Sequence, residues 1–404
     1  METIEASFSF SSSLVMSTAG LRSTRRAVAS PPAVRTDRAA PPEKWPHPLA
    51  AGSLAPLLRS LLRRNGYRWR NVDVRLLSRL VASCVPGIGF RAWERASPQM
   101  RAALRTPPRP PLFVIGHWRS GTTHLHNLLV RDRQFGYCST AHVASSGAFL
   151  TLPRFIRRHL RGTIPQRRPR DEMDFAWTGP QEEEFALARL GEQSFYHCFF
   201  FPRRAEEIFS RSVLLEDGER ALQRWKRDYD TLLRRLSYAE GGRTLCLKNP
   251  ANTARVRSLL ELYPDAKFVF VVRDPEQVFR SMRQMWQAMT GLYSLTGETL
   301  ADVDETVLSY YERLMRRYLD DRNAIPAGRL VEVRYEELRS QPLAAIDRIY
   351  SGLDVADLDR ALPEMKEYLD GQSQYRTNRH ELIPADRAAL RDRWSFAFDA
   401  WGYR

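Results

Sequence analysis

The stretch PLFVIGHWRSGTTHLHNLL, residues 111–129, decides the fold. It opens with a short apolar run, which predicts a buried strand, and then places Gly116 and Gly121 five residues apart, directly before Thr122 and Thr123. Glycines at these positions let the backbone curl so that successive N–H groups point inward, and the helix that follows offers its positive end to an anion. The stretch therefore predicts a strand, a phosphate-cradling loop and a helix.

The loop lacks the residue that a nucleoside triphosphatase needs. Such enzymes have a lysine directly after the second glycine, where it reaches the β- and γ-phosphates. Here Thr122 stands at that position, and Arg119 supplies a guanidinium from within the loop. Taken alone, the two glycines also fit an ordinary strand-to-helix turn. The sequence therefore predicts an anion-binding loop that lacks the lysine with which such enzymes bind a triphosphate.

Other short apolar runs alternate with helix-length segments along the chain. They are TLCLK (244–248), AKFVFVV (266–272) and RLVEVRY (329–335). This alternation predicts a central parallel sheet with helices on both faces, a three-layer α/β/α fold. Ligands of such sheets bind at the carboxyl ends of the strands. The loop, Lys248 and Arg273 all follow strands at that edge.

Composition sets the expected domain organisation of the 404 residues. Residues 1–50 are rich in Ser, Arg, Ala and Pro and predict a disordered tail. Residues 51–105 space leucines three and four apart with arginines between, which predicts an amphipathic helical extension. The main domain is expected over residues 106–404. A net charge of +15 favours an anionic ligand, a phosphate-bearing cofactor or an anionic membrane surface.

The leucine stripes of residues 51–105 have two interpretations. The favoured one packs the leucines against the main domain with the arginines in solvent; the other lays a basic amphipathic face on an anionic membrane. No run of about eighteen apolar residues occurs, so a soluble or peripheral protein is expected. The four cysteines form no CxxC pair, which favours a reducing compartment and a cytoplasmic location.

Two segments carry a resemblance to a known family. RSGTTHLHNLL, residues 119–129, resembles the 5′-phosphosulfate loop of the sulfotransferase family. LKNPANTARVRSLLELYPDAKFVFVVRDPEQVFRSM, residues 247–282, resembles its 3′-phosphate segment, and YEEL, residues 335–338, is similar to its later strand exit. The resemblance implies a P-loop-like fold and the transfer of a sulfuryl group from 3′-phosphoadenosine-5′-phosphosulfate (PAPS), the co-substrate, to a hydroxyl or amine. The acceptor would be an unidentified small molecule, lipid or glycan. The resemblance implies neither a metal nor a nucleic-acid partner.

The resemblance also implies roles for individual residues. Lys248 would stabilise charge on the leaving oxygen. The cofactor residues would be Arg119, Ser120, Gly121, Thr122 and Thr123 at the 5′ end, with Arg273 and Ser281 at the 3′-phosphate.

The general base is the least defined residue. Pro250 stands where many cytosolic sulfotransferases have a histidine, and K-N-P is similar to the tyrosylprotein sulfotransferases, which use a glutamate shortly after the first helix. The corresponding stretch here, YCSTAHVASS, offers His142. The acidic cluster QEEEFAL, residues 181–187, offers further carboxylates, although a helix turns about 100° per residue and so at most one or two can face a cleft. Glu183 is the first candidate and His142 the second; a complement to the helix dipole is the alternative role of the cluster.

Three other functions compete with sulfuryl transfer. A P-loop kinase or nucleotidase would explain the glycines and could use Asp274 as a magnesium ligand. A nucleic-acid-binding protein would explain the positive charge, although the arginines are spread through amphipathic helices. A non-catalytic nucleotide-binding relative would need no base.

Overall fold

The computed structural model describes residues 47–50, 52–64, 72–152, 158, 176–371 and 384–403. Within them a five-stranded sheet has the order β2-β3-β1-β4-β5, and every pairing is parallel. The strands are β1 (Leu112–Gly116), β2 (Phe135–Gly136), β3 (Thr244–Lys248), β4 (Lys267–Val272) and β5 (Leu330–Arg334). The tail predicted over residues 1–50 falls, except for its last four residues, outside the described part.

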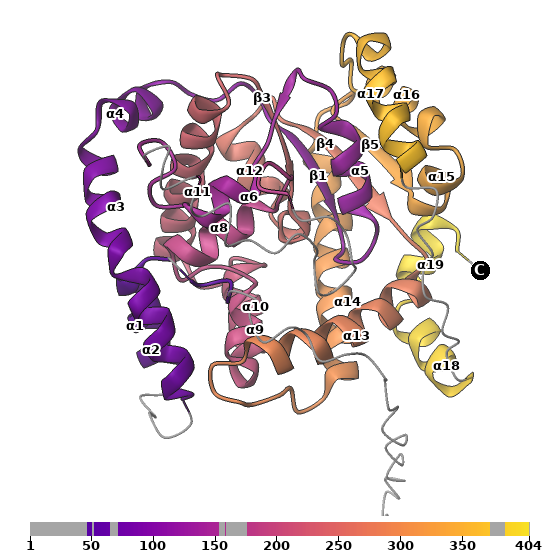
Figure 1. Ribbon diagram of the computed structural model, residues 1–404. Helices are drawn as coiled ribbons and strands as arrows, with labels where there is room; N and C mark the ends of the chain where they lie inside the picture. Colours follow the sequence, from indigo (N-terminus) through magenta and orange to yellow (C-terminus); the bar gives the residue numbers. More distant parts are fainter. Residues whose placement is uncertain are drawn as a thin grey trace, which may run out of the picture. The chain divides into compact units, whose positions relative to one another are not determined.

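The four strands predicted from apolar runs are confirmed. The strand β2 was missed, because a pair of residues carries no periodic pattern. Since β1 lies between β3 and β4, the loop after β1 is flanked by the residues that end those two strands (Figure 1). The parallel order thus brings Lys248 and Arg273 to the two sides of the glycine loop.

Helices cover both faces of the sheet, and the N-terminal helices α1 to α4 lie to one side of it (Figure 1). The N-terminal helices are α1 (Leu54–Arg64), α2 (Val74–Cys84), α3 (Pro86–Ala96) and α4 (Pro98–Arg105). The helices up to β3 are α5 (Thr122–Leu129), α6 (Thr140–Ala144), α8 (Glu183–Leu190), α9 (His197–Phe200), η1 (Pro202–Arg204), α10 (Ala205–Ser212) and α11 (Glu219–Ala239). Those after β3 are η2 (Pro250–Ala254), α12 (Val256–Leu262), α13 (Pro275–Tyr293), α14 (Val303–Asp321), η3 (Arg322–Ala324), α15 (Tyr335–Ser340), α16 (Pro342–Gly352), α17 (Leu358–Gly371), α18 (Pro384–Arg393) and α19 (Ser395–Trp401).

The sheet separates two hydrophobic clusters, because successive side chains of a strand point to opposite faces. Val114 and Val269 belong to the cluster that contains α5, α16 and α17. Phe113 and Phe270 belong to the larger cluster, in which Phe270 stacks on Tyr318 of α14 at 3.9 Å between ring centroids. Both faces are therefore buried, and the predicted three-layer α/β/α fold is confirmed. None of the described helices combines the length and the apolar character needed to cross a membrane.

The N-terminal helices pack on the main domain through leucines and through one buried ion pair. Leu57, Leu61 and Leu80 are buried, as the favoured interpretation predicted. The guanidinium of Arg235 on α11 donates to the Glu94 carboxylate of α3, and both side chains are almost fully buried. The other oxygen of Glu94 accepts from the backbone N–H of Leu150 at 2.7 Å. Glu94 therefore ties α3 to two segments of the main domain.

We expect Glu94→Ala to lower the free energy of unfolding by about 3–5 kcal/mol, because the substitution leaves Arg235 buried without its carboxylate. Urea denaturation followed by circular dichroism measures this change. Glu337→Ala is the matched control: it removes the carboxylate from Arg348, but the two side chains are 36% and 46% exposed, so the loss should be at most about 1 kcal/mol. Equal losses in the two variants would contradict the anchoring role of Glu94.

Candidate active site

The loop between β1 and α5 is held by contacts that require glycine at both of its ends. Gly116 has a φ of 141°, and a Cβ there would lie 2.3 Å from the carbonyl oxygen of Val271. Thr253 Oγ1 accepts from the Gly116 N–H at 2.7 Å and donates to its carbonyl at 3.0 Å. Gly121 has a φ of 99°, and a Cβ there would lie 2.1 Å from the Tyr335 ring. The curled backbone predicted from the two glycines is therefore fixed by close neighbours on β4, η2 and α15.

The residues predicted for the two ends of the cofactor come together around this loop. Arg119 adopts a left-handed backbone with a φ of 69°, and its Nε donates to Ser281 Oγ on α13 at 2.8 Å. Arg273 donates from Nη1 to the Arg119 carbonyl at 3.1 Å. The Arg273 guanidinium also lies 4.5 Å from the centroid of the Tyr335 ring, a cation–π contact. Tyr335 and Thr253 support the loop, and sequence reasoning did not single them out.

Two buried donors in this region have no hydrogen-bond partner among the described residues: Ser120 Oγ and Arg273 Nε. A buried donor without an acceptor is costly, so these two atoms would gain from a ligand that accepts hydrogen bonds. Gly121 caps α5 without a side-chain hydrogen bond. Thr122, in the first turn of α5, is buried and Thr123 is half-buried. The arrangement offers donors and a positive helix end, which fits a group with several anionic oxygens.

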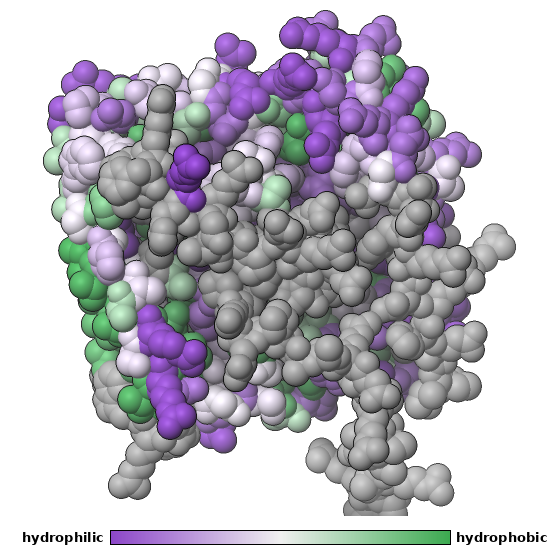
Figure 2. Space-filling model, viewed as in Figure 1, coloured by the Kyte–Doolittle hydropathy of each residue, from purple (hydrophilic) through white to green (hydrophobic). Residues whose placement is uncertain are grey.

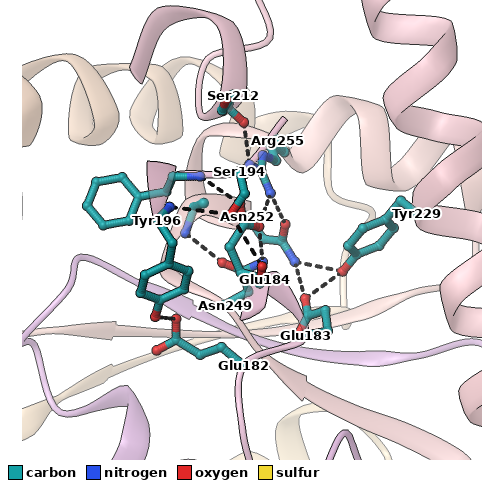
Figure 3. Close-up of polar contacts among 12 residues, drawn as sticks. Glu182, Glu183, Glu184, Ser194, Tyr196, Ser212, Tyr229, Asn249, Asn252 and Arg255 are labelled. Atoms are coloured by element: carbon teal, nitrogen blue, oxygen red, sulfur yellow. Dashed lines mark hydrogen bonds and ion pairs between the residues drawn. The ribbon is translucent and has the colours of Figure 1, made fainter. Parts of the chain in front are cut away.

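Three consecutive glutamates at the start of α8 are all buried, and they point to different partners (Figure 3). The sequence predicted that they would diverge; the helical turn separates Glu183 from Glu184, whereas Glu182 is the N-cap of α8 and has extended backbone angles, φ −71° and ψ 131°. Glu182 is 8% exposed, whereas Glu183 and Glu184 are 0% and 1% exposed. The three carboxylates therefore differ in their access to any substrate.

Glu182 lies at the sheet edge beside Lys248. Lys248 ends β3, and its ammonium group forms an ion pair with Glu182. The hydroxyl of Tyr196 donates to the second carboxylate oxygen. Tyr196 stacks on Phe185 at 3.9 Å between ring centroids. A cation, a carboxylate and an apolar aromatic surface therefore meet at this point.

Glu183 lies deeper, among neutral donors. Its Oε1 accepts from the Tyr229 hydroxyl at 2.8 Å and from Asn252 Nδ2 at 3.0 Å. Its Oε2 is buried and has no partner among the described residues. Burial raises the pKa of Glu183, and the hydrogen bond from Tyr229 only partly opposes this.

Glu184 serves as a fixed negative charge. Arg255 grips it with two nitrogens, at 2.9 and 3.3 Å, and Asn249 Nδ2 donates at 2.8 Å. Burial alone would raise the pKa of Glu184, but Arg255 outweighs it and the pKa is lowered. Because the pair ties α8 to the turn before α12 and is almost inaccessible, its role is structural.

His142, the second candidate base, caps helix α6. Its ring Nδ1 accepts from the backbone N–H of Ser139 at 3.2 Å, and the backbone N–H of His142 donates to Ser139 Oγ at 3.3 Å. Its Nε2 lies 3.8 Å from the Glu240 carboxylate. These contacts belong to a capping box, which gives His142 a structural role at the start of α6.

Other titratable residues near the loop have structural contacts: two buried histidines donate hydrogen bonds to backbone carbonyls, and one aspartate caps a helix. Burial lowers the pKa of His117 to about 4 and, together with Lys248, the pKa of His126 to about 3. Asp274 caps α13 by accepting from the Glu276 N–H at 2.9 Å. Within the described ranges, no group of three or more His, Cys, Asp or Glu side chains is arranged to hold a metal ion.

Comparison with known proteins adds independent information. Residues 110–359 match the sulfotransferase family. The chain is 31% identical over 366 residues to the omega-hydroxy-beta-dihydromenaquinone-9 sulfotransferase Stf3 of Mycobacterium bovis. This alignment covers 89% of this chain and 92% of that protein. A shorter match, 28% identical over 142 residues, links it to a putative protein-tyrosine sulfotransferase of Caenorhabditis briggsae and covers 35% of this chain and 42% of that protein.

Solved structures share the fold. The sulfotransferase STF9 from Mycobacterium avium superposes with a TM-score of 0.61 at 19% identity, covering 77% of this chain and 81% of that chain. The sulfotransferase STF1 from Mycobacterium tuberculosis gives a TM-score of 0.60 at 19% identity, covering 86% and 94%. The family match, the extent of the Stf3 alignment and this shared fold lead to one conclusion. The chain belongs to the sulfotransferase family and is a sulfotransferase.

Proposed function

We propose that the enzyme transfers the sulfuryl group of PAPS to a hydroxyl group on an apolar acceptor molecule. The observation that carries the proposal is the convergence of Arg119, Ser281 and Arg273 on the glycine loop. PAPS has anionic groups at both ends of its adenosine and therefore needs two separate anion sites. A loop beside an arginine and serine pair offers two such sites on one sheet edge.

The loop would hold the 5′-phosphosulfate. Ser120 Oγ and the N–H groups at the start of α5 point to that role, together with the hydroxyls of Thr122 and Thr123. Arg273 and Ser281 would hold the 3′-phosphate, because a guanidinium forms paired hydrogen bonds with phosphate oxygens. The contact between Arg119 and Ser281 links the two sites.

Lys248 and Glu182 would carry the transfer. The acceptor oxygen bonds to sulfur as the bond between sulfur and the phosphate oxygen breaks, so negative charge gathers on the leaving oxygen and the acceptor must lose a proton. Lys248 would leave Glu182 for the leaving oxygen, and the carboxylate of Glu182 would then take the proton. We assign the base to Glu182 in preference to Glu183 or His142, because Glu182 adjoins Lys248 and is the most accessible of the three glutamates.

The acceptor proposal rests on the surroundings of Glu182 and on the relative. Phe185 is half-buried beside Tyr196, so apolar surface adjoins the carboxylate. Stf3 of Mycobacterium bovis is named for an omega-hydroxy menaquinone derivative. A hydroxyl at the end of an apolar molecule would bring its oxygen to Glu182 while its chain contacts aromatic side chains.

Arg273→Ala should abolish detectable binding of 3′,5′-adenosine bisphosphate, because the 3′-phosphate loses its paired hydrogen bonds. Isothermal titration calorimetry measures the affinity, and ATP with Mg²⁺ serves as the competing ligand. Arg329→Ala is the control. It removes an arginine at the opposite edge of the sheet, where it contacts Asp265, and should leave the affinity unchanged. Tighter binding of ATP with Mg²⁺ than of the bisphosphate would overturn the donor assignment.

Glu182→Gln should lower kcat by about 10²–10⁴-fold, the usual contribution of a general base. Bisphosphate affinity should persist, because the loop and Arg273 are untouched. The assay follows transfer of the radiolabelled sulfuryl group from PAPS to primary alcohols of increasing apolar chain length. It measures kcat and identifies the acceptor class. Glu183→Gln is the comparison, since it keeps the size of a buried carboxyl whose pKa is raised. A larger loss of kcat in Glu183→Gln, with folding intact, would move the base to Glu183.

A further inference from the structure

Helix α3 presents its apolar side to solvent and its charged side to the protein. Its buried residues are Arg91 and Glu94, three positions apart. On its outer side, Ile88 is 48% exposed and Trp93 is 54% exposed. The usual surface helix has the opposite arrangement. The orientation is fixed, because Glu94 is paired with Arg235 and Arg91 donates to the Cys84 carbonyl at 3.0 Å.

The exposed apolar side continues from α3 onto α2. Val85 joins the two helices with helical backbone angles, φ −59° and ψ −50°, and is 49% exposed. Val74, 71% exposed, precedes Val85 by eleven residues, which is about three helical turns and so the same side. We call Val74, Val85, Ile88 and Trp93 the α2–α3 face. Figure 2 shows hydrophobic residues along the left edge, where α1, α2 and α3 lie in Figure 1.

The charges around this face are mostly positive; the exposed acidic exception is Asp73, which caps the start of α2. Between residues 74 and 105 the single acidic residue is Glu94, which is buried. The exposed charged side chains of this segment are Arg75, Arg79, Arg95, Arg101 and Arg105. No described residue forms an ion pair with them. An apolar strip bordered by arginines, with tryptophan at its edge, is complementary to a surface that is negative outside and apolar beneath.

The same charges argue against a second copy of the chain as the occupant. In a two-fold interface each patch meets its own copy, so the arginines of one chain would oppose those of the other. Like charges brought together across an interface are costly. An anionic bilayer meets both features, because its head groups pair with arginine while the apolar side chains enter the boundary of the acyl region.

We propose that the α2–α3 face docks on the surface of an anionic lipid bilayer. The helices lie in the plane of the interface, with Ile88 and Trp93 in the outer acyl layer and Arg75 and Arg79 at the head groups. Docking needs neither donor nor acceptor, so it is independent of the proposed reaction. It would also place a sulfotransferase beside apolar molecules dissolved in the membrane.

Co-sedimentation with lipid vesicles tests the proposal. The full chain should bind vesicles of phosphatidylcholine with about 30% phosphatidylglycerol at least tenfold more tightly than vesicles of phosphatidylcholine alone, and high salt should weaken the binding. The double variant I88S/W93S should lose at least tenfold in affinity. The charge-reversal variant R75E/R79E should lose the preference for anionic lipid.

The variant R220E/R224E is the matched control. It reverses two exposed arginines of α11 at the same spacing of four residues, so overall charge changes equally while the α2–α3 face is untouched. It should retain clearly tighter vesicle binding than R75E/R79E. Thermal melts monitored by circular dichroism establish that each variant is folded.

Three outcomes would overturn the proposal. One is equal binding of wild type and I88S/W93S, and another is equal binding to anionic and neutral vesicles. The third is a dimer in light scattering that is lost in I88S/W93S, with no vesicle binding, which would assign the face to a second copy. Vesicle binding is measured without nucleotide, so failure of the proposed donor leaves this result unaffected.

Discussion

Three consecutive carboxylates are buried where α8 begins, and the architecture of the site depends on the ion pairs and hydrogen bonds that stabilise them. Moving an ionised carboxylate into the interior costs several kcal/mol unless it is paired and hydrogen-bonded. Glu182 is met by a lysine, Glu183 by neutral donors, and Glu184 by an arginine. The partners come from β3, α11 and the turns after β3. The contacts that neutralise the glutamates therefore also fix α8 against the carboxyl edge of the sheet.

The contacts of the three glutamates differ in how easily they can rearrange. Arg255 holds Glu184 with a planar two-nitrogen grip, and its side chain is 0% exposed, so moving it would leave a charge buried without a partner. Lys248 is a point charge on a flexible stem and can exchange one oxygen for another by rotation. Its partner Glu182 is also partly accessible. The Lys248–Glu182 pair at the sheet edge is thus suited to a role in the reaction, whereas the Arg255–Glu184 pair stabilises the fold.

Sequence patterns predicted the parts of this site that depend on local order. Apolar runs located the four longer strands, and the ends of parallel strands then placed Lys248 and Arg273 beside the glycine loop. The helical turn per residue predicted that the three glutamates diverge, but not where each one points. Tyr229 and Arg255 reach them from 46 and 71 positions away, and no local pattern encodes such pairings. Burial of all three carboxylates depends on those distant partners.

The N-terminal helices illustrate the same limit at the surface. Leucine spacing predicts that Leu61 and Leu80 face inward, and they do. In α3 the spacing defines an apolar side equally well, yet that side faces outward, because Glu94 has a buried partner in Arg235. Periodicity gives the sides of a helix, and long-range charge pairing decides which side is buried. In α3 the inward ion pair of Glu94 turns the opposite side, with Ile88 and Trp93, toward solvent, so one electrostatic contact shapes both the core contact and the exposed face.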